Sequence, residues 1–364
     1  MQYAAYISLA FLAMQLVNVL LNFIFSQKIK KPTAYNDELI SVLIPARNEE
    51  ANIGALLQSL CEMKNARLEI LVCDDESTDR TSAIVSEYSK KNPAIKLLKS
   101  DGLPAGWLGK NHACYQLAQH AAGAYYLFID ADVKLQGTVI TDTVSYLKKY
   151  RLGLLSIFPT QIMKTFGEKI TVPVMNYILL TLLPLIFVRI SPFSSHSAAN
   201  GQFMLFDAGV YKKFEPHQHF KSSAVEDISI SRFFKKNQTK IACITGEKRV
   251  ECRMYTSYEA AINGFSKNIF MFFGNNPVLA FVFWTLSTLG FVPVIIWKWQ
   301  YFPVYLLAVL LIQLIYSVVG RQNPLTNIAF FPLQLGFLLQ VMVKSLSLKK
   351  QKQSTWKGRN ISTY

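Results

Sequence analysis

The sequence predicts an α/β domain with a mainly parallel sheet, flanked by apolar membrane helices. Three observations lead to this fold class. Short apolar runs alternate with segments of helical periodicity through residues 38–276, and long uncharged apolar stretches lie on either side of that region. In addition, 51% of the 364 residues are hydrophobic. Strands that alternate with crossover helices form parallel sheets buried on both faces, so we expect a folded domain joined to membrane segments.

The first apolar stretch, residues 3–25, contains no charged side chain and is long enough to cross a hydrocarbon core. A cleavable signal peptide is the alternative, but its apolar region usually has only about 7–15 residues. The stretch also lacks a basic start and a small-residue cleavage site. We therefore predict that residues 1–27 form a membrane anchor. Lys28, Lys30 and Lys31 follow it, so the positive-inside rule places the next region in the cytosol.

Three more apolar blocks follow the central region. They span roughly residues 278–297, 301–320 and 325–343. We assign residues 277–345 to a C-terminal transmembrane region and residues 346–364 to a basic cytosolic tail. We therefore expect a multi-pass protein of the cell membrane whose α/β domain, residues 38–276, is cytosolic.

The number of C-terminal crossings stays open. Three full crossings would put the basic tail outside, against the positive-inside rule, so an even number fits better. Either the last block, which Pro332 interrupts, lies in the interface or re-enters, or residues 172–190 form another crossing. We prefer an interfacial position for residues 172–190, because Pro173 and Pro184 stand within their apolar run.

The basic excess, a formal net charge of +15, indicates anionic partners. Beside membrane segments it favours anionic lipid headgroups or phosphate-bearing substrates, and we expect no nucleic acid partner. The five cysteines are odd in number and lack CxxC spacing, which argues against a disulfide framework and against a zinc site.

The central region alternates strands and helices. Strands at Ile40–Ile44 and Ile70–Cys73 each end in a polar turn that a helical segment follows, and residues 94–98 form the next strand. A helix over residues 110–121 leads to a strand over residues 125–130. In parallel sheets, ligands bind beyond the carboxyl ends of the strands. The polar clusters of this sequence stand at those ends.

Asp130 and Asp132 stand where an apolar run leaves the predicted sheet. In extended register the two carboxylates point the same way, and they repel each other unless a cation lies between them. Mg²⁺ or Mn²⁺ takes one or two carboxylates and completes its ligands with water and phosphate oxygens. A solvated Asx turn is the alternative for an isolated pair. We predict that Asp130 and Asp132 bind Mg²⁺ or Mn²⁺.

Five motifs of the central region carry a family resemblance. They are SVLIPARNEEANI, EILVCDDESTDRT, GLPAGWLGKNHAC, FIDADV and VEDISISRFFKK. In this order and spacing they resemble the family 2 glycosyltransferases of the GT-A type. The stretches GWLGKNHA and STWKGRNISTY resemble the membrane-bound branch of that family, which glycosylates lipids such as hopanoids and the carotenoid 4,4'-diaponeurosporenoate. The resemblance implies a GT-A, Rossmann-like domain that binds a nucleotide sugar.

The resemblance also assigns the donor site. In the family, the Pro-x-x-Asn-Glu turn and the acidic pair after the second strand hold the uridine of a UDP-sugar. The matching residues are Pro45, Arg47, Glu49, Asp74 and Asp75. Carboxylates suit the donor edge of uracil and the ribose hydroxyls. Lys110 opens a helix, where a cation and free amides favour phosphate, so we assign Lys110 to the diphosphate, together with Asp130.

Two later stretches are expected to line the acceptor cleft. Gly201 and Gln202 form a turn ahead of a strand, a position that lines the donor sugar and acceptor in the family. Glu226 and Asp227 precede a helical run, where a carboxylate can take a proton from the attacking acceptor oxygen. The alternative is that both carboxylates only favour the helix start. We predict Asp227 as the catalytic base, with Glu226, Gly201 and Gln202 in the acceptor cleft.

The predicted activity is an inverting, metal-dependent transfer of one sugar, expected to be glucose, from a UDP-sugar to a lipid. The acceptor would be a carotenoid or another isoprenoid or glycerolipid, and a hopanoid or polyprenyl phosphate is the alternative. Many processive members carry a Gln/Arg-x-x-Arg-Trp motif where this sequence has INGFSKNIFMFF, so we do not expect polymer synthesis. Lys267 and Arg253 are candidates for the cation that assists UDP departure.

Two other protein classes fit parts of the sequence. A dinucleotide-binding oxidoreductase shares the parallel sheet, but PARNEE stands where its Gly-x-Gly-x-x-Gly turn would follow the first strand. A membrane transporter or scaffold would account for the apolar blocks. It would leave the five motifs unexplained, and the blocks lack the carboxylates of an ion pathway.

Overall fold

The computed structural model describes residues 2–32, 37–63, 66–351, 355–356 and 359–360. They form two compact units, and each unit combines separate stretches of the chain. The sheet unit is built mainly from Gln27–Thr160 and Phe187–Arg253. The helical unit contains the N-terminal helix, Gln161–Ile186 and the helices that follow Met254.

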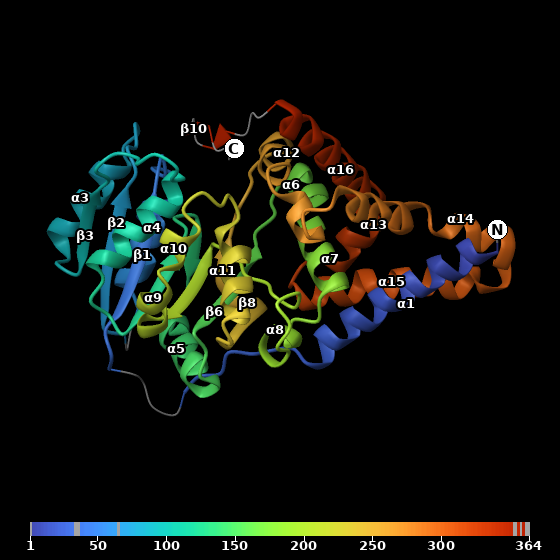
Figure 1. The fold of residues 1–364 in the computed structure, drawn as a ribbon, viewed down its shortest axis with the longest axis horizontal. Helices are drawn as coiled ribbons and strands as arrows, with labels where there is room; N and C mark the ends of the chain where they lie inside the picture. Colours follow the sequence, from blue (N-terminus) through green and yellow to red (C-terminus); the bar gives the residue numbers. More distant parts are fainter. Residues whose placement is uncertain (1, 33–36, 64–65, 352–354, 357–358, 361–364) are drawn as a thin grey trace. The chain divides into compact units, whose positions relative to one another are not determined.

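The sheet unit is organised around one mixed eight-stranded sheet with the order β3-β2-β1-β4-β7-β6-β8-β5 (Figure 1). The strands are β1 (Ile40–Ala46), β2 (Leu68–Asp74), β3 (Ile95–Lys99), β4 (Tyr125–Ile129), β5 (Val133–Leu135), β6 (Leu154–Gln161), β7 (Phe203–Asp207) and β8 (Ile241–Cys252). Strands β1 to β4 are parallel, as predicted. Strand β7 pairs antiparallel with both β4 and β6, and β5 pairs antiparallel with β8, which the sequence did not predict.

The sheet unit also contains helices. They are α2 (Ile53–Cys61), α3 (Thr81–Lys91), α4 (Gly109–His120), α5 (Val139–Tyr150), α9 (Ala208–Phe214), α10 (Pro216–His219) and α11 (Glu226–Lys236). All of these except α10 contact the strands directly, and α10 packs mainly on α4 and α11. Every residue of β4 is buried, as expected for a strand covered on both faces. The short helix α8 (Ile186–Ile190) begins where the chain passes from the helical unit to the sheet unit, and the two-residue strands β9 (Thr355–Trp356) and β10 (Arg359–Asn360) pair antiparallel.

The helical unit is a bundle of apolar helices. Its elements are α1 (Tyr3–Ile24), α6 (Phe166–Thr171), α7 (Pro173–Leu182), α12 (Tyr258–Phe265), η1 (Ile269–Phe273), α13 (Pro277–Leu289), α14 (Phe291–Lys298), η2 (Trp299–Tyr301), α15 (Phe302–Val319) and α16 (Pro324–Gln351). Three stretches of the described chain are long and apolar enough to cross a membrane: Tyr3–Ile24, Phe291–Val319 and Pro324–Leu348. Helix α16 continues through Pro332, which therefore does not divide the last apolar block into two helices.

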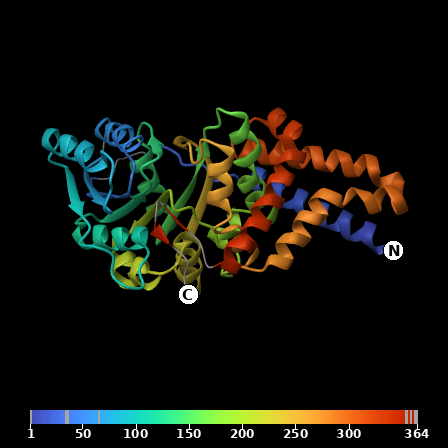
Figure 2. The ribbon, with the colours of Figure 1, turned by 90° about the horizontal axis from the view of Figure 1, so that it is seen from above.

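Helices α14 and α15 form a hairpin whose turn is η2, as both ribbon views show (Figures 1 and 2). Both helices contact α1. The ammonium of Lys298, at the end of α14, lies 5.1 Å from the ring centroid of Tyr6. The turn of the hairpin therefore lies near the N-terminal end of α1. Because the chain reverses at η2, α14 and α15 do not form one straight span.

Residues 172–190 divide between the two units, because Gln161–Ile186 group with the apolar helices. Helix α7 packs against α1, α15 and α16. The Nδ2 atom of Asn22 in α1 donates to the carbonyls of Leu180 and Leu183, at 3.0 Å each, where α7 ends. A carbonyl freed at a helix end needs a partner inside an apolar bundle. Helix α1 is thus a packed member of the bundle, and the interfacial position of residues 172–190 stays a prediction.

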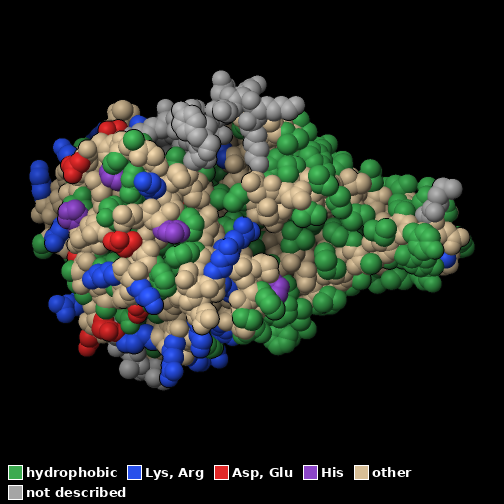
Figure 3. Space-filling view, viewed as in Figure 1, with side chains coloured by type: hydrophobic (Ala, Val, Ile, Leu, Met, Phe, Trp, Pro, Cys, Tyr) green, Lys and Arg blue, Asp and Glu red, His purple; other side chains and the backbone are tan. Residues whose placement is uncertain are grey.

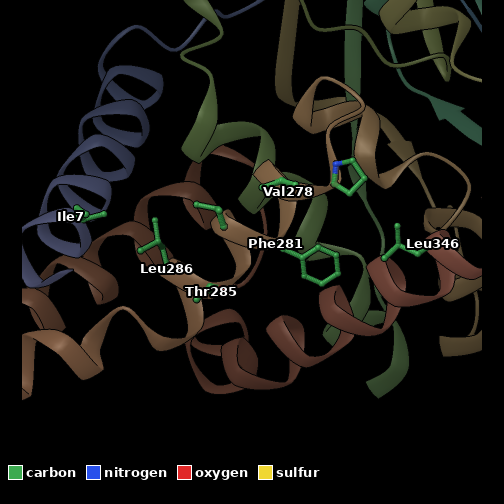
Figure 4. A pocket seen from close by; sticks show the side chains of 8 residues that line it. Ile7, Val278, Phe281, Thr285, Leu286 and Leu346 are labelled. Atoms are coloured by element: carbon green, nitrogen blue, oxygen red, sulfur yellow. The ribbon is translucent and has the colours of Figure 1, made fainter. Parts of the chain in front are cut away.

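The surface of the helical unit is mainly hydrophobic in the view of Figure 3, whereas Lys and Arg gather on the sheet unit. A shallow pocket of about 570 Å³ opens among α1, α13 and α16 (Figure 4). Its lining includes Ile7, Val278, Phe281, Leu286 and Leu346, and it is almost entirely apolar. Such a lining suits hydrocarbon and offers nothing to a charged ligand, so the polar chemistry of the protein has to be sought on the sheet unit.

Candidate active site

The carboxyl ends of β1 and β2 bring the predicted donor residues together. Ala46 and Asp74, the last residues of the two strands, lie side by side in the parallel register. The backbone N–H of Asp75 donates to the Ala46 carbonyl at 2.8 Å, and Arg47 Nη1 donates to the Asp75 carbonyl at 2.5 Å. Pro45 lies in β1, opposite Cys73 of β2. The loops after the two strands therefore form one continuous polar edge.

Three side chains fasten these two loops to each other. Asn48, at a positive φ of 52°, accepts from the backbone N–H of Thr78 at 2.8 Å. Glu50 accepts from the N–H of Arg80, and Asp79 accepts from the N–H of Glu50, both at 3.0 Å. Asn48 and Glu50 were not among the predicted site residues. The available signal was the ability of Asn to adopt a left-handed conformation and to bond nearby backbone.

Glu49 lies in the same loop and has both backbone and side-chain partners. Its N–H donates to Thr81 Oγ1 at 2.8 Å, and its carboxylate accepts from Asn52 Nδ2 at 2.8 Å. Its negative charge is also one of the influences that raise the pKa of Asp132. Glu49 therefore lies within electrostatic reach of the predicted metal pair.

Lys110, in the first turn of α4, lies between two carboxylates. Its Nζ is 2.9 Å from Asp130 Oδ1 and 3.3 Å from Glu226 Oε1. Burial acts to lower the pKa of Lys110, but the charges of Asp130 and Glu226 outweigh it and hold the pKa well above its usual value. Only 9% of the Glu226 side chain is exposed. The structure thus fixes a permanent cation between a strand-end carboxylate and a helix-start carboxylate.

Asn111 connects the start of α4 to the loop before α11. Its Nδ2 donates to the carbonyls of Phe220 at 2.9 Å, Lys221 at 3.2 Å and Ser223 at 2.9 Å, in the loop that precedes α11. The N–H of Leu108, just before α4, donates to the Lys221 carbonyl at 2.8 Å. These bonds keep the start of α4 against the start of α11. Nothing in the sequence indicated this role for Asn111.

Gly201 and Asp227 meet beside Lys110. The Gly201 N–H donates to Asp227 Oδ2 at 3.0 Å. A Cβ atom on Gly201 would lie 3.1 Å from Lys110 Nζ and 3.3 Å from Glu226 Oε1, so the close approach favours glycine here. Burial, and next the charge of Glu226, raise the pKa of Asp227 to about 7. A carboxylate with that pKa can accept a proton near neutral pH.

Asp132 has one buried oxygen without a partner. Among the residues that the structure describes, no group donates a hydrogen bond to Asp132 Oδ1. Asp132 Oδ2 lies 3.5 Å from Gln202 Nε2, which is 2.8 Å from Cys252 Sγ. Burial, and next the charge of Asp130, raise the pKa of Asp132 to about 7. An unpartnered buried carboxylate oxygen is costly, and a cation would relieve that cost.

The carboxylates of the site can be compared with two kinds of metal site, one built from protein ligands alone and one completed by a nucleotide. Across the described ranges, no group of three or more His, Cys, Asp and Glu side chains could hold a metal by itself. An all-protein metal cage therefore does not fit. Mg²⁺ bound together with a nucleotide needs only one or two carboxylates, because phosphate oxygens and water supply the other ligands. Asp130 and Asp132, with the unpartnered oxygen of Asp132, fit that second kind of site.

Sequence comparisons identify relatives of this chain. Residues 41–200 match the sequence model described as Glycosyl transferase family 2. The 4,4'-diaponeurosporenoate glycosyltransferase of Staphylococcus haemolyticus (strain JCSC1435) is 30% identical over 244 residues, which are 66% of this chain and 63% of that protein. The enzyme of the same description from Staphylococcus aureus (strain USA300) is 27% identical over 245 residues, with the same shares. The matched region thus spans less than two thirds of these relatives.

A comparison of structures extends over more of the chain. The mannosyltransferase PcManGT of Pyrobaculum calidifontis, solved in complex with GDP-Man and Mn²⁺, aligns with a TM-score of 0.57 and 16% sequence identity. The alignment covers 94% of this chain and 99% of that protein. At this identity the likeness concerns the fold alone.

Proposed function

Since this chain carries a family 2 glycosyltransferase domain over residues 41–200 and has the GT-A fold, we propose that it transfers one sugar from a nucleotide sugar to a lipid in the membrane. One observation carries the proposal: Lys110 is fixed between Asp130 and Glu226, and Asp227 lies next to them. A fixed cation suits a diphosphate, and a carboxylate of raised pKa suits proton removal. The cluster therefore contains a cation for the departing diphosphate and a carboxylate for the proton of the acceptor.

The donor is assigned to the edge formed by the loops after β1 and β2. Pro45, Arg47, Glu49, Asp74 and Asp75 would hold the nucleoside, and Lys110 with Asp130 would contact the diphosphate. The geometry supports this assignment because hydrogen bonds join the two loops, and because Lys110 contacts Asp130, which follows β4, the strand next to β1. UDP-glucose is the donor that we expect. PcManGT was solved with GDP-Man, so the base is the first property to test.

Asp130 and Asp132 would hold the divalent ion, Mg²⁺ or Mn²⁺. When bound there together with the donor, the ion would neutralise charge that develops on the departing diphosphate. Lys110 supplies a second, permanent positive charge from the protein. Arg253 follows β8 and Lys267 follows α12, and both stay candidates for a further cation.

Asp227 is assigned as the base for the acceptor. The acceptor oxygen attacks the anomeric carbon while the bond between that carbon and the diphosphate breaks, and Asp227 takes the acceptor proton. Attack opposite the leaving group inverts the anomeric configuration. The N–H of Gly201 holds the Asp227 carboxylate in place, and Glu226, Gly201 and Gln202 would line the acceptor cleft.

A lipid acceptor is supported by the relatives and by the apolar helices. The descriptions of the relatives name a carotenoid acid, 4,4'-diaponeurosporenoate. In addition, three stretches of the described chain are long and apolar enough to cross a membrane. We propose a carotenoid or another isoprenoid or glycerolipid as acceptor, with a hopanoid or polyprenyl phosphate as the second choice. The net charge of +15 supports contact with anionic lipid headgroups.

Calorimetry with nucleotides tests the proposal. We expect UDP to bind in the presence of Mn²⁺ and to bind more weakly after chelation. Binding of NAD instead would indicate an oxidoreductase, and a protein that binds no nucleotide would be a transporter or scaffold. Mass spectrometry of lipid extracts from cells with and without the protein would then identify the sugar and the acceptor.

Replacing Gly201 by Ala is expected to lower transfer severalfold to about tenfold, because the new Cβ would crowd Lys110 Nζ and Glu226 Oε1 and shift them by a few tenths of an ångström. The matched control is Gly54→Ala in α2, whose Cβ would lie at an ordinary 3.7 Å from Ile84. Initial rates at saturating donor decide the outcome. Equal rates for both variants would contradict the tight packing proposed around Gly201.

The topology is expected to place the basic tail and the loop of Lys28, Lys30 and Lys31 on the same, cytosolic side. If α13 with α14, and then α15, each cross the membrane, they contribute two crossings, and an even C-terminal count then requires that α16 does not cross fully. Cysteines introduced at Ser347 and at Thr33, which lies outside the described residues, can be labelled in sealed vesicles. Opposite accessibility would mean that α16 makes a third C-terminal crossing.

A further inference from the structure

Lys235 is a buried cation, and within the described part of the chain its hydrogen-bond partners are backbone carbonyls and not carboxylates. It lies near the end of α11 and is 7% exposed. Its Nζ donates to the carbonyls of Phe187 at 3.0 Å, Ser191 at 2.9 Å, Phe193 at 3.4 Å and His196 at 2.7 Å. An ammonium has three N–H donors, so four carbonyls share them. Burial lowers the pKa of Lys235 to about 8.

These carbonyls belong to one segment, residues 187–202, which we call the strap. The strap is folded around the ammonium, and His196 Nδ1 closes it further with a 2.8 Å hydrogen bond to Ser191 Oγ. Burying a lysine ammonium costs free energy of folding unless hydrogen bonds replace its contacts with water. Here the ammonium attaches the end of α8 and the loop that follows it to α11.

The strap is attached to α11 a second time, at the candidate active site. Its inner end contains Gly201, whose N–H donates to Asp227 Oδ2. Asp227 and Lys235 are eight residues apart in α11, which corresponds to about 12 Å along the helix axis. The same helix therefore positions both ends of the strap, one through a carboxylate and the other through an ammonium.

The exposed side chains of the strap suit an apolar ligand. Ile190 and Phe193 are 62% and 66% exposed, and they lie within the part that Lys235 holds. Arg189 fixes its side chain elsewhere, since Nη1 donates to Tyr146 Oη at 2.9 Å. A nucleotide would gain little from Ile190 and Phe193, whereas a lipid would bury them. The exposed surface of the strap therefore favours a lipid acceptor over a nucleotide donor as its ligand.

We propose that Lys235 is a positioning residue for the acceptor: it holds residues 187–196 on α11 and thereby keeps Gly201 against Asp227. This inference rests on the proposed function, in which Asp227 is the base. Lys235 itself touches neither donor nor acceptor in this scheme. Its loss should loosen the strap and impair use of the acceptor, while the donor site, built on the loops after β1 and β2, stays intact.

The test compares Lys235→Met with Lys236→Met. Lys236 is the next residue of the same helix and is exposed, so its substitution removes the same charge without affecting the strap. Hydrogen–deuterium exchange of the full-length protein in detergent should rise over residues 187–202 in Lys235→Met alone. With UDP-glucose and 4,4'-diaponeurosporenoate, kcat/KM for the acceptor should fall about tenfold to a hundredfold, and UDP affinity should stay within about twofold.

Three results would overturn the inference. They are unchanged exchange over the strap, increased exchange with unchanged acceptor kcat/KM, and equal losses of UDP affinity and acceptor use. If Lys235→Met does not fold, His196→Ala is the second test, because it removes the hydrogen bond to Ser191 that closes the strap. It should raise the KM for the acceptor and leave the affinity for UDP unchanged. A wild-type protein that binds no nucleotide would refute the proposed function instead, and the exchange data would still show whether Lys235 holds the strap.

Discussion

Replacing Asp227 by Asn should lower turnover about 10²- to 10⁴-fold with a hydroxyl acceptor and leave donor affinity nearly unchanged. Asn has the size of Asp and retains an oxygen that can accept from the Gly201 N–H, so the turn at Gly201 should persist. What disappears is the ability to take the acceptor proton. Steady-state kinetics with separate variation of donor and acceptor measure the effect.

The chemistry of the acceptor changes the size of this effect. A carboxylic acid acceptor is already ionised at neutral pH and needs no base, so the loss in Asp227→Asn should then be smaller and reflect positioning alone. If Asp227→Asn weakens donor binding as strongly as it slows transfer, Asp227 belongs to the donor site and the base has to be sought at Glu226 or elsewhere.

The pH profile gives an independent check on Asp227. Because burial raises its pKa to about 7, the active, deprotonated form should be lost as the pH falls through about 7. With a hydroxyl acceptor, kcat/KM should therefore decrease toward acidic pH in the wild type. The contribution of Asp227 to this limb should be absent from the residual activity of Asp227→Asn, and a limb that remains would belong to Asp132, whose pKa burial also raises to about 7.

Replacing Asp132 by Asn should reduce metal-dependent transfer by roughly 10³-fold, because a metal ion supplies several kcal/mol of charge stabilisation in the transition state. Asn is similar in size to Asp and can still form hydrogen bonds, but it lacks the negative charge. The buried, unpartnered Oδ1 of Asp132 could then no longer bind a cation as a carboxylate does. The binding of Mn²⁺ in the presence of UDP, followed by calorimetry, should weaken in parallel. Chelation of the wild type should abolish transfer.

Asp101→Asn is the matched control for this experiment. Asp101 is an exposed carboxylate in the loop after β3, and its substitution removes one negative charge without touching Asp130 or Asp132. Metal binding and transfer should both stay at wild-type levels. Normal transfer by Asp132→Asn without added metal would show that the pair does not serve a metal.

The parallel half of the sheet could be predicted from sequence because its signals are local. Each strand from β1 to β4 is an apolar run that a polar turn ends, and the parallel pairing follows from the helices between them. Asp74 and Asp130 lie at strand ends for the same reason. Strand β7 was not placed by such reasoning, since its insertion between β4 and β6 depends on partners about 50 to 80 residues away in the chain.

The sequence by itself determined the strand ends, the apolar helices and the residue types at the candidate site, because hydrophobic period and charge are properties of short segments. Only the tertiary structure decided that Lys110 lies between Asp130 and Glu226, and that a side chain on Gly201 would crowd both Lys110 and Glu226. It also decided that Gln161–Ile186 pack with the apolar helices. These features arise from contacts between residues far apart in the chain, and such contacts are fixed by the packing of whole elements.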